Sequence, residues 1–346
     1  MSEANVSDGR NIGPSGTLSG EGSTIRVEHL ADAFPAPTEP RGVPEARVEG
    51  AGPDYYGVPL LKEHVWKWMI PAYFYTGGVS AGASLVAAIG ESMDDRAFRN
   101  VIPKCKTTAA AAAVASAVLL IADLGRPARF AYMLRVVRPT SPMSVGTWLL
   151  SASGGSATLA ALIGSGRGGW GTLGRAATAA AGLLAPALAS YTAVLVSNTT
   201  VPVWQTPRRV LPHLFTSSSV ASIGAIVQLF ARTPAERALA RALSACGNAG
   251  ELAFGRVVER VLGGSPRGTL PLERRRSGAL WKASKLCAAA GLGLGLLSGR
   301  SRNAALAAAA LTTAGALCMR FGLVDAGKQS ARDARASFAQ QRGASV

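Results

Sequence analysis

The segment WKWMIPAYFYTGGVSAGASLVAAIG, residues 66–90, decides the fold class. After Lys67 it continues to Gly90 without a charged residue. A helix that crosses a bilayer needs about 20 mainly apolar residues, so this segment predicts a transmembrane helix. Trp66 and Trp68 at its start are typical of a membrane–water interface.

Similar apolar segments recur along the rest of the chain. They lie at 107–124, 144–164, 174–197, 210–231, 238–262, 280–298 and 303–323. The segment 238–262 is the weakest because it contains Arg241, Glu251, Arg256 and Glu259, so an amphipathic helix lying in the interface is its alternative. Glycine and alanine are frequent in these segments and favour close helix packing. The sequence thus predicts an all-α polytopic membrane protein with about eight transmembrane helices.

Composition agrees with this fold class and argues against a soluble protein. The chain is 48% hydrophobic and 16% charged, whereas soluble domains carry about 25% charged residues. The net charge of +16 would suit a nucleic-acid-binding protein, but residues 1–64 carry 5 basic and 10 acidic residues. The basic excess therefore lies between apolar segments, where it acts as an orientation signal. We expect no nucleic-acid partner.

The same charges predict the orientation and the domain organisation. Basic residues are more numerous in the loops on the N-terminal side of the membrane, which predicts cytoplasmic termini in a bacterial inner membrane. Residues 1–53 are rich in Gly, Ser, Pro and Glu, and predict a disordered acidic tail. No cleavable signal is expected there. We expect one four-helix bundle over 54–204, a second over 205–325 and a basic tail over 326–346.

Polar side chains at the mouth of the first apolar segment are the first functional candidates. His64 and Trp68 lie at this mouth, and Tyr73 lies about two helical turns below Trp66, where its hydroxyl needs a partner. Tyr75 points roughly 200° away from Tyr73 on the helix, so the two cannot face one pocket equally. An aromatic belt is the structural alternative for the tryptophan.

A second group lies between the second and third segments, in IADLGRPARFAYMLRVVRPTSPMSVGTW. Asp123 ends the second segment, and Gly125 can end its helix. The carboxylate can form an ion pair with a nearby arginine or relay protons at the edge of the bundle. The candidates for contact with a partner or with anionic lipid are Arg126, Arg129, Arg135 and Arg138.

A third group is SYTAVLVSNTTVPVW, in which Tyr191 lies within the fourth segment. Tyr191 and Tyr73 can reach one cavity if the first and fourth helices are neighbours.

The sequence contains few cysteine and histidine residues that could bind a metal ion or a haem. The 4 cysteines are far apart and form no C-x-x-C pair, which argues against a zinc site or an iron–sulfur cluster. Of the 3 histidines, His29 lies in the tail, His64 at the mouth of the first segment and His213 at the start of the fifth. We expect no metal site and no haem on this chain.

Three stretches together resemble the polysulfide reductase membrane-subunit family, which is also called NrfD or PsrC. They are WKWMIPAYFYTGGVSAG, DLGRPARFAYMLRVVRPTSPMSVGTW and YTAVLVSNTTVPVW, and they span about 66–204. The resemblance implies two four-helix bundles with a quinone pocket in the first. Tyr73 and Tyr191 would line this pocket, with Tyr75, His64 and Trp68 near its mouth and Asp123 on a proton path. Some members have His and Asn where this chain has Tyr73 and Met69.

The resemblance also implies the partners and the cofactor. Such a subunit binds menaquinone or ubiquinone and docks a four-cluster ferredoxin-like iron–sulfur subunit on the cytoplasmic face. That subunit exchanges electrons with a molybdopterin catalytic subunit of the formate dehydrogenase or polysulfide/nitrite reductase type in anaerobic respiration. Two alternatives stay open from the sequence: a secondary transporter, for which the halves show no paired broken helices, and a purely structural membrane anchor.

Overall fold

The structure is a computed structural model that describes most of the chain after residue 63. The described residues are 11–12, 17–19, 25–26, 61, 64–93, 98–126, 128–164, 168–264, 268–273, 275–297, 301–333 and 336–337. The chain divides into two units, Met1–Pro59 and Leu60–Val346. In the first unit, the short strands β1 (Asn11–Ile12), β2 (Thr17–Ser19) and β3 (Ile25–Arg26) pair antiparallel in the order β1-β2-β3. The rest of the expected disordered tail lies outside the described residues.

In the second unit, the described residues form eight long helices. These are α2 (Met69–Met93), α3 (Val101–Asp123), α5 (Pro142–Ile163), α6 (Gly169–Ser197), α8 (Leu211–Phe230), α9 (Pro234–Gly263), α11 (Arg275–Leu297) and α12 (Arg302–Arg332). Shorter helices connect them: α4 (Ala128–Leu134), α7 (Pro202–Gln205) and α10 (Leu270–Glu273). Each predicted apolar segment is helical, which confirms the predicted all-α fold class.

The helix bounds differ from the apolar segments mainly at polar ends. The helix α3 begins at Val101 rather than 107 because Lys104 and Lys106 lie on its first turns, where a hydropathy window excludes them. The helix α12 continues to Arg332, beyond the apolar segment that ends at 323. The helix α9 begins with a capping box in which Thr233 accepts from the Glu236 backbone N–H at 3.1 Å.

Six of these eight helices are long and apolar enough to cross a membrane. The remaining two are α5, of 22 residues, and α9, of 30 residues. The helix α9 is the segment that the sequence marks as weakest. In α5, serine, glycine and threonine dilute the apolar residues. The protein is therefore a multi-pass membrane protein in which six spans meet both criteria.

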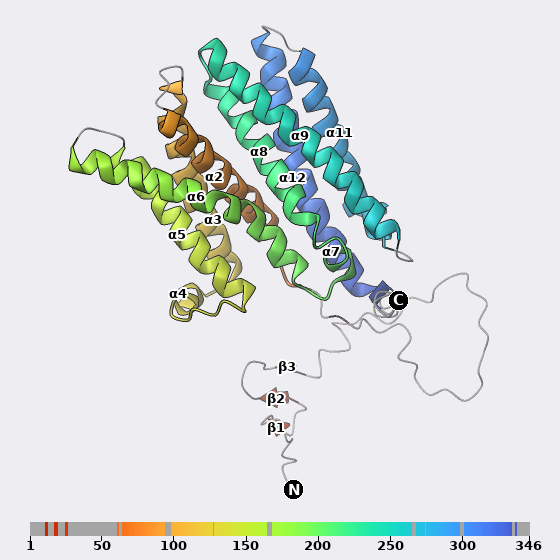
Figure 1. The fold of residues 1–346 in the computed structure, drawn as a ribbon. Helices are drawn as coiled ribbons and strands as arrows, with labels where there is room; N and C mark the ends of the chain where they lie inside the picture. Colours follow the sequence, from red (N-terminus) through yellow and green to blue (C-terminus); the bar gives the residue numbers. More distant parts are fainter. Residues whose placement is uncertain are drawn as a thin grey trace, which may run out of the picture. The chain divides into compact units, whose positions relative to one another are not determined.

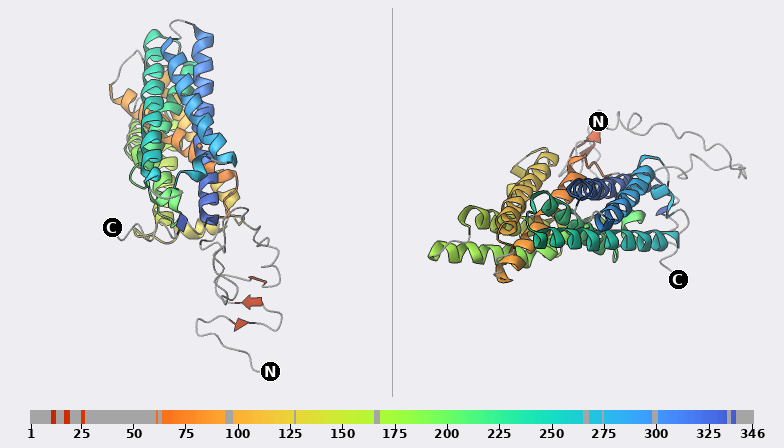
Figure 2. Two further views of the ribbon diagram at one scale, coloured as in Figure 1. Left: turned by 90° about the vertical axis from the view of Figure 1, so that its right-hand side faces the viewer. Right: turned by 90° about the horizontal axis from the view of Figure 1, so that it is seen from above.

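The long helices pack as two groups of four. The helices α2, α3, α5 and α6 contact one another, and so do α8, α9, α11 and α12 (Figures 1 and 2). The groups join where α2 and α6 contact α8 and where α12 contacts α2. The Cβ that an alanine would add at Gly82 of α2 would lie 2.9 Å from Ile223 Cγ2 of α8, so the two helices approach closely there. This junction places the N-terminal end of α2 beside α7 and α12.

Candidate functional site

Aromatic rings form a continuous cluster at the N-terminal end of α2. The His64 ring lies 4.8 Å from Trp66 and 5.3 Å from Trp204, measured between ring centroids. Trp66 and Trp204 stack at 5.4 Å with 20° between their planes. Phe74 continues the cluster, since its centroid lies 6.2 Å from Trp66 and 5.6 Å from Tyr73. The flat surfaces of this cluster suit a planar ring.

His64 supplies an unused polar atom within this cluster. Its Nδ1 is buried and has no hydrogen-bond partner among the described residues. Burial and the nearby Lys328 ammonium both lower the pKa of His64 from its ordinary value. The imidazole therefore stays neutral at neutral pH and can present one N–H donor and one acceptor.

The helix α12 holds the cluster in place. Trp204 Nε1 donates to the Leu323 carbonyl at 2.8 Å, and Lys328 Nζ donates to the Trp66 carbonyl at 2.5 Å. Gly327 lets the indole approach the α12 backbone, since an added Cβ would lie 1.8 Å from Trp204 Cζ2. Lys328 lies within α12, in the region 326–346 that the sequence assigned to a basic tail.

Tyr73 of α2 and Tyr191 of α6 lie on two helices that contact each other. Tyr73 is 2% exposed and Tyr191 7%. Their hydroxyls lie near enough to interact electrostatically. The Tyr191 hydroxyl donates to the Pro142 carbonyl at 2.5 Å and lies against Gly146 of α5. Three helices of the first group therefore meet at this pair.

Asp123 lies beside the same end of α2. Its Oδ1 accepts from the Lys67 backbone N–H at 3.1 Å, so the end of α3 is fixed to the start of α2. Within the described part of the chain, Asp123 forms no ion pair with Arg126 or Arg129. Gly125 follows with φ +70° and ends α3, as its position in the sequence predicts.

Trp68 lies apart from the cluster. Its side chain is 63% exposed and lines a cavity of about 150 Å³ together with Trp66, Phe321 and Lys328. The position fits an interfacial aromatic residue beside the mouth of α2.

Tyr75 faces the second group of helices rather than Tyr73. The Arg320 guanidinium of α12 lies 5.6 Å from its ring centroid. Arg320 is 1% exposed, and its Nη1 donates to Ser218 Oγ at 2.7 Å. Glu251 of α9 is also buried, and its charge interacts with that of Arg320. Sequence reasoning missed Arg320, although a charge inside an apolar segment is itself a signal of function.

The four candidate arginines lie on the same end of the first group as Asp123. All four are exposed, on α4 or on the segments that flank it. Arg135 lies over the Tyr132 ring at 5.8 Å. Exposed apolar residues accompany them, with Tyr132 60% and Val137 67% exposed. This end therefore presents a basic surface with exposed apolar side chains.

Comparison with known proteins assigns the family. The family model described as "Polysulphide reductase, NrfD" matches residues 59–242. This range covers more than half of the chain and includes α2 to α8 with the aromatic cluster. No curated protein matches the chain. The resemblance seen in the sequence is confirmed, and the chain belongs to the NrfD polysulphide reductase family of membrane subunits of redox complexes.

Proposed function

We propose that this chain exchanges electrons between a membrane quinone and an iron–sulfur subunit docked on its α4 end. The observation that carries the proposal is the buried, unpartnered Nδ1 of His64 against the Trp66 and Trp204 rings. A quinone head group is planar and has carbonyl oxygens that accept hydrogen bonds. The donor and the aromatic surfaces at this end of α2 fit such a group.

Residues at different depths of the first group of helices would have different roles in quinone binding and proton transfer. When bound, menaquinone or ubiquinone takes up or releases two electrons and two protons. His64 would orient one carbonyl through its N–H, the Tyr73 hydroxyl would supply a second polar contact deeper in the bundle, and Tyr191 would line the pocket beside it. Asp123, at the mouth of α2, would pass protons to and from the aqueous phase.

The exposed arginines near α4 support the docking part of the proposal. A basic surface with exposed apolar residues suits a partner whose surface is acidic and partly apolar. The proposed partner is a four-cluster ferredoxin-like subunit, which would exchange electrons with a molybdopterin catalytic subunit. With cytoplasmic termini, this docking surface would lie on the cytoplasmic side of the cell membrane.

The test uses the intact complex with His64→Phe, which keeps an aromatic ring but removes the donor. We expect quinone-linked turnover to fall about tenfold, as for the loss of one hydrogen bond of about 1.4 kcal/mol. Turnover with a redox dye that reacts at the catalytic subunit should stay unchanged. His64→Gln restores a donor and should recover part of the activity.

The matched control is His213→Phe on α8, where the histidine is exposed and stacks on Phe254 at 5.3 Å. This control should keep full quinone-linked turnover. Unchanged turnover in His64→Phe, Tyr73→Phe and Tyr191→Phe would instead indicate a purely structural anchor.

A further inference from the structure

Two adjoining cavities lie at the opposite end of the second group of helices from Trp204. One, of about 310 Å³, lies between α9, α11 and α12, and the other, of about 920 Å³, lies beyond the ends of α8 and α9. Gln228, Arg241 and Ala305 line both cavities. The two therefore form one groove that leads from the helix ends into the membrane-spanning region.

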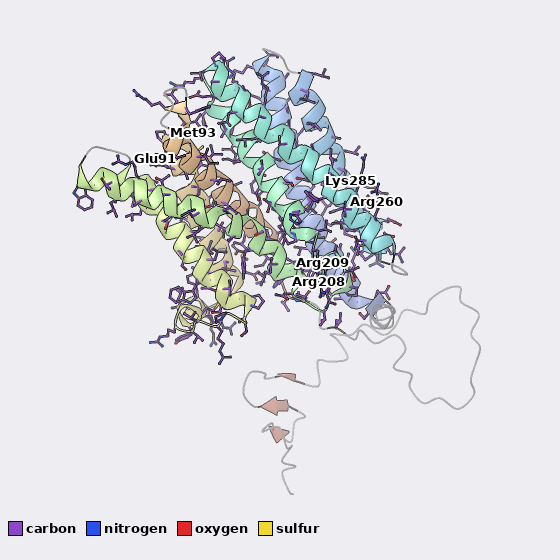
Figure 3. All side chains as sticks on the ribbon, in the orientation of Figure 1. Glu91, Met93, Arg208, Arg209, Arg260 and Lys285 are labelled. Atoms are coloured by element: carbon purple, nitrogen blue, oxygen red, sulfur yellow. The ribbon has the colours of Figure 1, made fainter. Side chains whose placement is uncertain are left out.

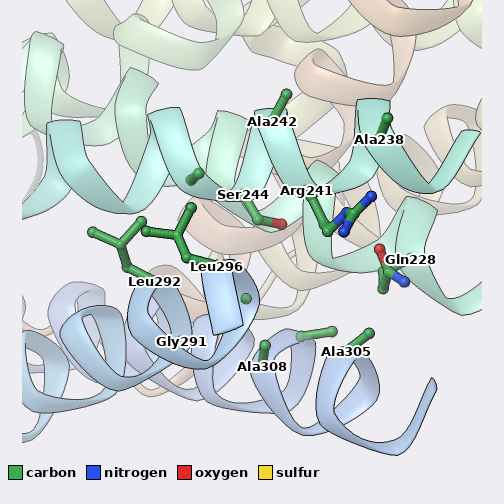
Figure 4. A pocket seen from close by; sticks show the side chains of 13 residues that line it. Gln228, Ala238, Arg241, Ala242, Ser244, Gly291, Leu292, Leu296, Ala305 and Ala308 are labelled. Atoms are coloured by element: carbon green, nitrogen blue, oxygen red, sulfur yellow. The ribbon is translucent and has the colours of Figure 1, made fainter. Parts of the chain in front are cut away.

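The inner part of the groove is apolar. Leu292 and Leu296 line one side of it, with Gly291 of α11 and Ala308 of α12 close by (Figure 4). Arg241 and Gln228 extend their polar ends at the other side (Figure 4). Small residues leave space in the groove, and leucine side chains form an apolar wall along it. This lining suits a hydrocarbon chain.

The outer part of the groove is strongly basic. Among the described lining residues, the charged ones are Lys104, Arg232, Arg237, Arg241 and Arg302, and none is acidic. Arg237 Nη2 donates to the Arg232 carbonyl at 2.8 Å, which holds this guanidinium at the start of α9. The N-terminal ends of α9 and α12, both of about 30 residues, add positive helix dipoles at the same place.

Two described carboxylates close to this basic cluster in sequence are already engaged. Glu236 is 0% exposed, and its Oε2 accepts from the backbone N–H groups of Arg232 at 2.6 Å and Thr233 at 3.0 Å. Glu91 at the end of α2 forms an ion pair of 3.1 Å with Lys106. In the described part of the chain, neither of these two carboxylates forms an ion pair with Lys104, Arg237 or Arg302.

We propose that this groove binds one anionic glycerophospholipid. Its phosphate lies among Lys104, Arg237 and Arg302, since ammonium and guanidinium groups pair with phosphate oxygens. One acyl chain lies along Leu292 and Leu296. A head-group hydroxyl donates to Gln228 Oε1, which is buried and has no partner in the described part of the chain. Phosphatidylglycerol has all three of these features.

The test measures binding of defined lipids to the full chain, purified in detergent and stripped of lipid. Phosphatidylglycerol should raise the thermal unfolding midpoint and stay bound at one molecule per chain in native mass spectrometry. Phosphatidylcholine with the same acyl chains, and inorganic phosphate alone, should do neither. An equal effect of phosphatidylcholine would overturn the role of charge, and an equal effect of inorganic phosphate would overturn the role of the apolar groove.

Two pairs of variants locate the site. The double variant Arg237→Gln with Arg302→Gln should weaken phosphatidylglycerol binding about tenfold or more. Its control, Arg208→Gln with Arg209→Gln, removes the same charge at the other end of the helices (Figure 3) and should keep wild-type binding. Equal weakening by both would show non-specific attraction and overturn the site.

The second pair tests the apolar wall without changing charge. Gly295→Leu places a side chain in the groove, where an added Cβ makes only ordinary contact, 3.9 Å from Ala308 Cβ. This variant should also lower binding about tenfold. Gly293→Leu lies on the same helix with open space around its Cβ and should bind as wild type. Full binding by Gly295→Leu, or retention of an isoprenoid quinone in place of the phospholipid, would refute the proposal.

Discussion

Replacing Gly327 with alanine tests whether α12 positions the aromatic cluster. The new Cβ would lie 1.8 Å from Trp204 Cζ2, so the indole must move. Overpacking costs about 1 to 3 kcal/mol, and the hydrogen bond from Trp204 to the Leu323 carbonyl is worth about 1 kcal/mol. Loss of the stacked pair with Trp66 adds about 1 kcal/mol. We expect the free energy of unfolding to fall by about 3 to 5 kcal/mol.

The assay is unfolding of the full chain in detergent, followed by tryptophan fluorescence and by the thermal midpoint. The matched control is Gly155→Ala on α5, an exposed helical glycine with nothing within 4 Å of an added Cβ. Alanine there should leave stability unchanged or raise it by up to about 1 kcal/mol. If Gly327→Ala behaves like this control, Trp204 does not pack against α12 as described. Gly327→Ala should also weaken tryptophan quenching by a quinone analogue, because Trp204 and His64 move apart.

Three further predictions follow from the buried contacts. Gly146→Ala would place a Cβ 1.8 Å from the Tyr191 hydroxyl, so we expect a loss of about 1 to 3 kcal/mol in unfolding free energy, and a neutral result would contradict the packing of α5 on α6. Burial and the nearby lysine lower the pKa of His64, so the unfolded chain binds a proton that the folded chain does not as the pH falls below about 6.5. Stability should therefore decrease on acidification, and His64→Phe should reduce this dependence in a pH series of thermal midpoints; an identical pH dependence in the variant would refute the assignment. Arg320→Met or Glu251→Leu alone should each cost about 3 to 5 kcal/mol, whereas the double variant should cost less than their sum, and simple additivity in this double-mutant cycle would show that the two charges are not coupled.

The helices could be predicted because hydropathy is a local property. Each apolar segment became a helix, and Gly125 ends α3 where a positive φ is required. The polar ends could not be predicted in the same way. The last turns of α12 are held by contacts of Lys328 and Trp204 with distant residues, which no window along the chain contains.

The candidate site was predictable in its members but not in its arrangement. The spacing of Tyr73 and Tyr75 along one helix already separates their directions. Only packing decides that α2, which carries Tyr73, contacts α6, which carries Tyr191, and that Tyr75 meets Arg320. The role of Trp204 could not be predicted from the sequence. This residue follows the fourth segment, and its ring contacts His64 only when α7 packs beside α2.

The sequence by itself determined that the chain crosses a membrane, where its apolar helices lie and which family they resemble. These properties depend on the run of apolar residues and on local motifs, because transfer of each helix into lipid depends mainly on its own side chains. The tertiary structure decided which side chains meet: the His64 and Trp204 rings, the pairing of Asp123 with the Lys67 backbone, and the buried Arg320 beside Glu251. Some of these contacts join residues more than a hundred positions apart in the sequence. They form because the helices pack closely through small residues whose partners lie on other helices.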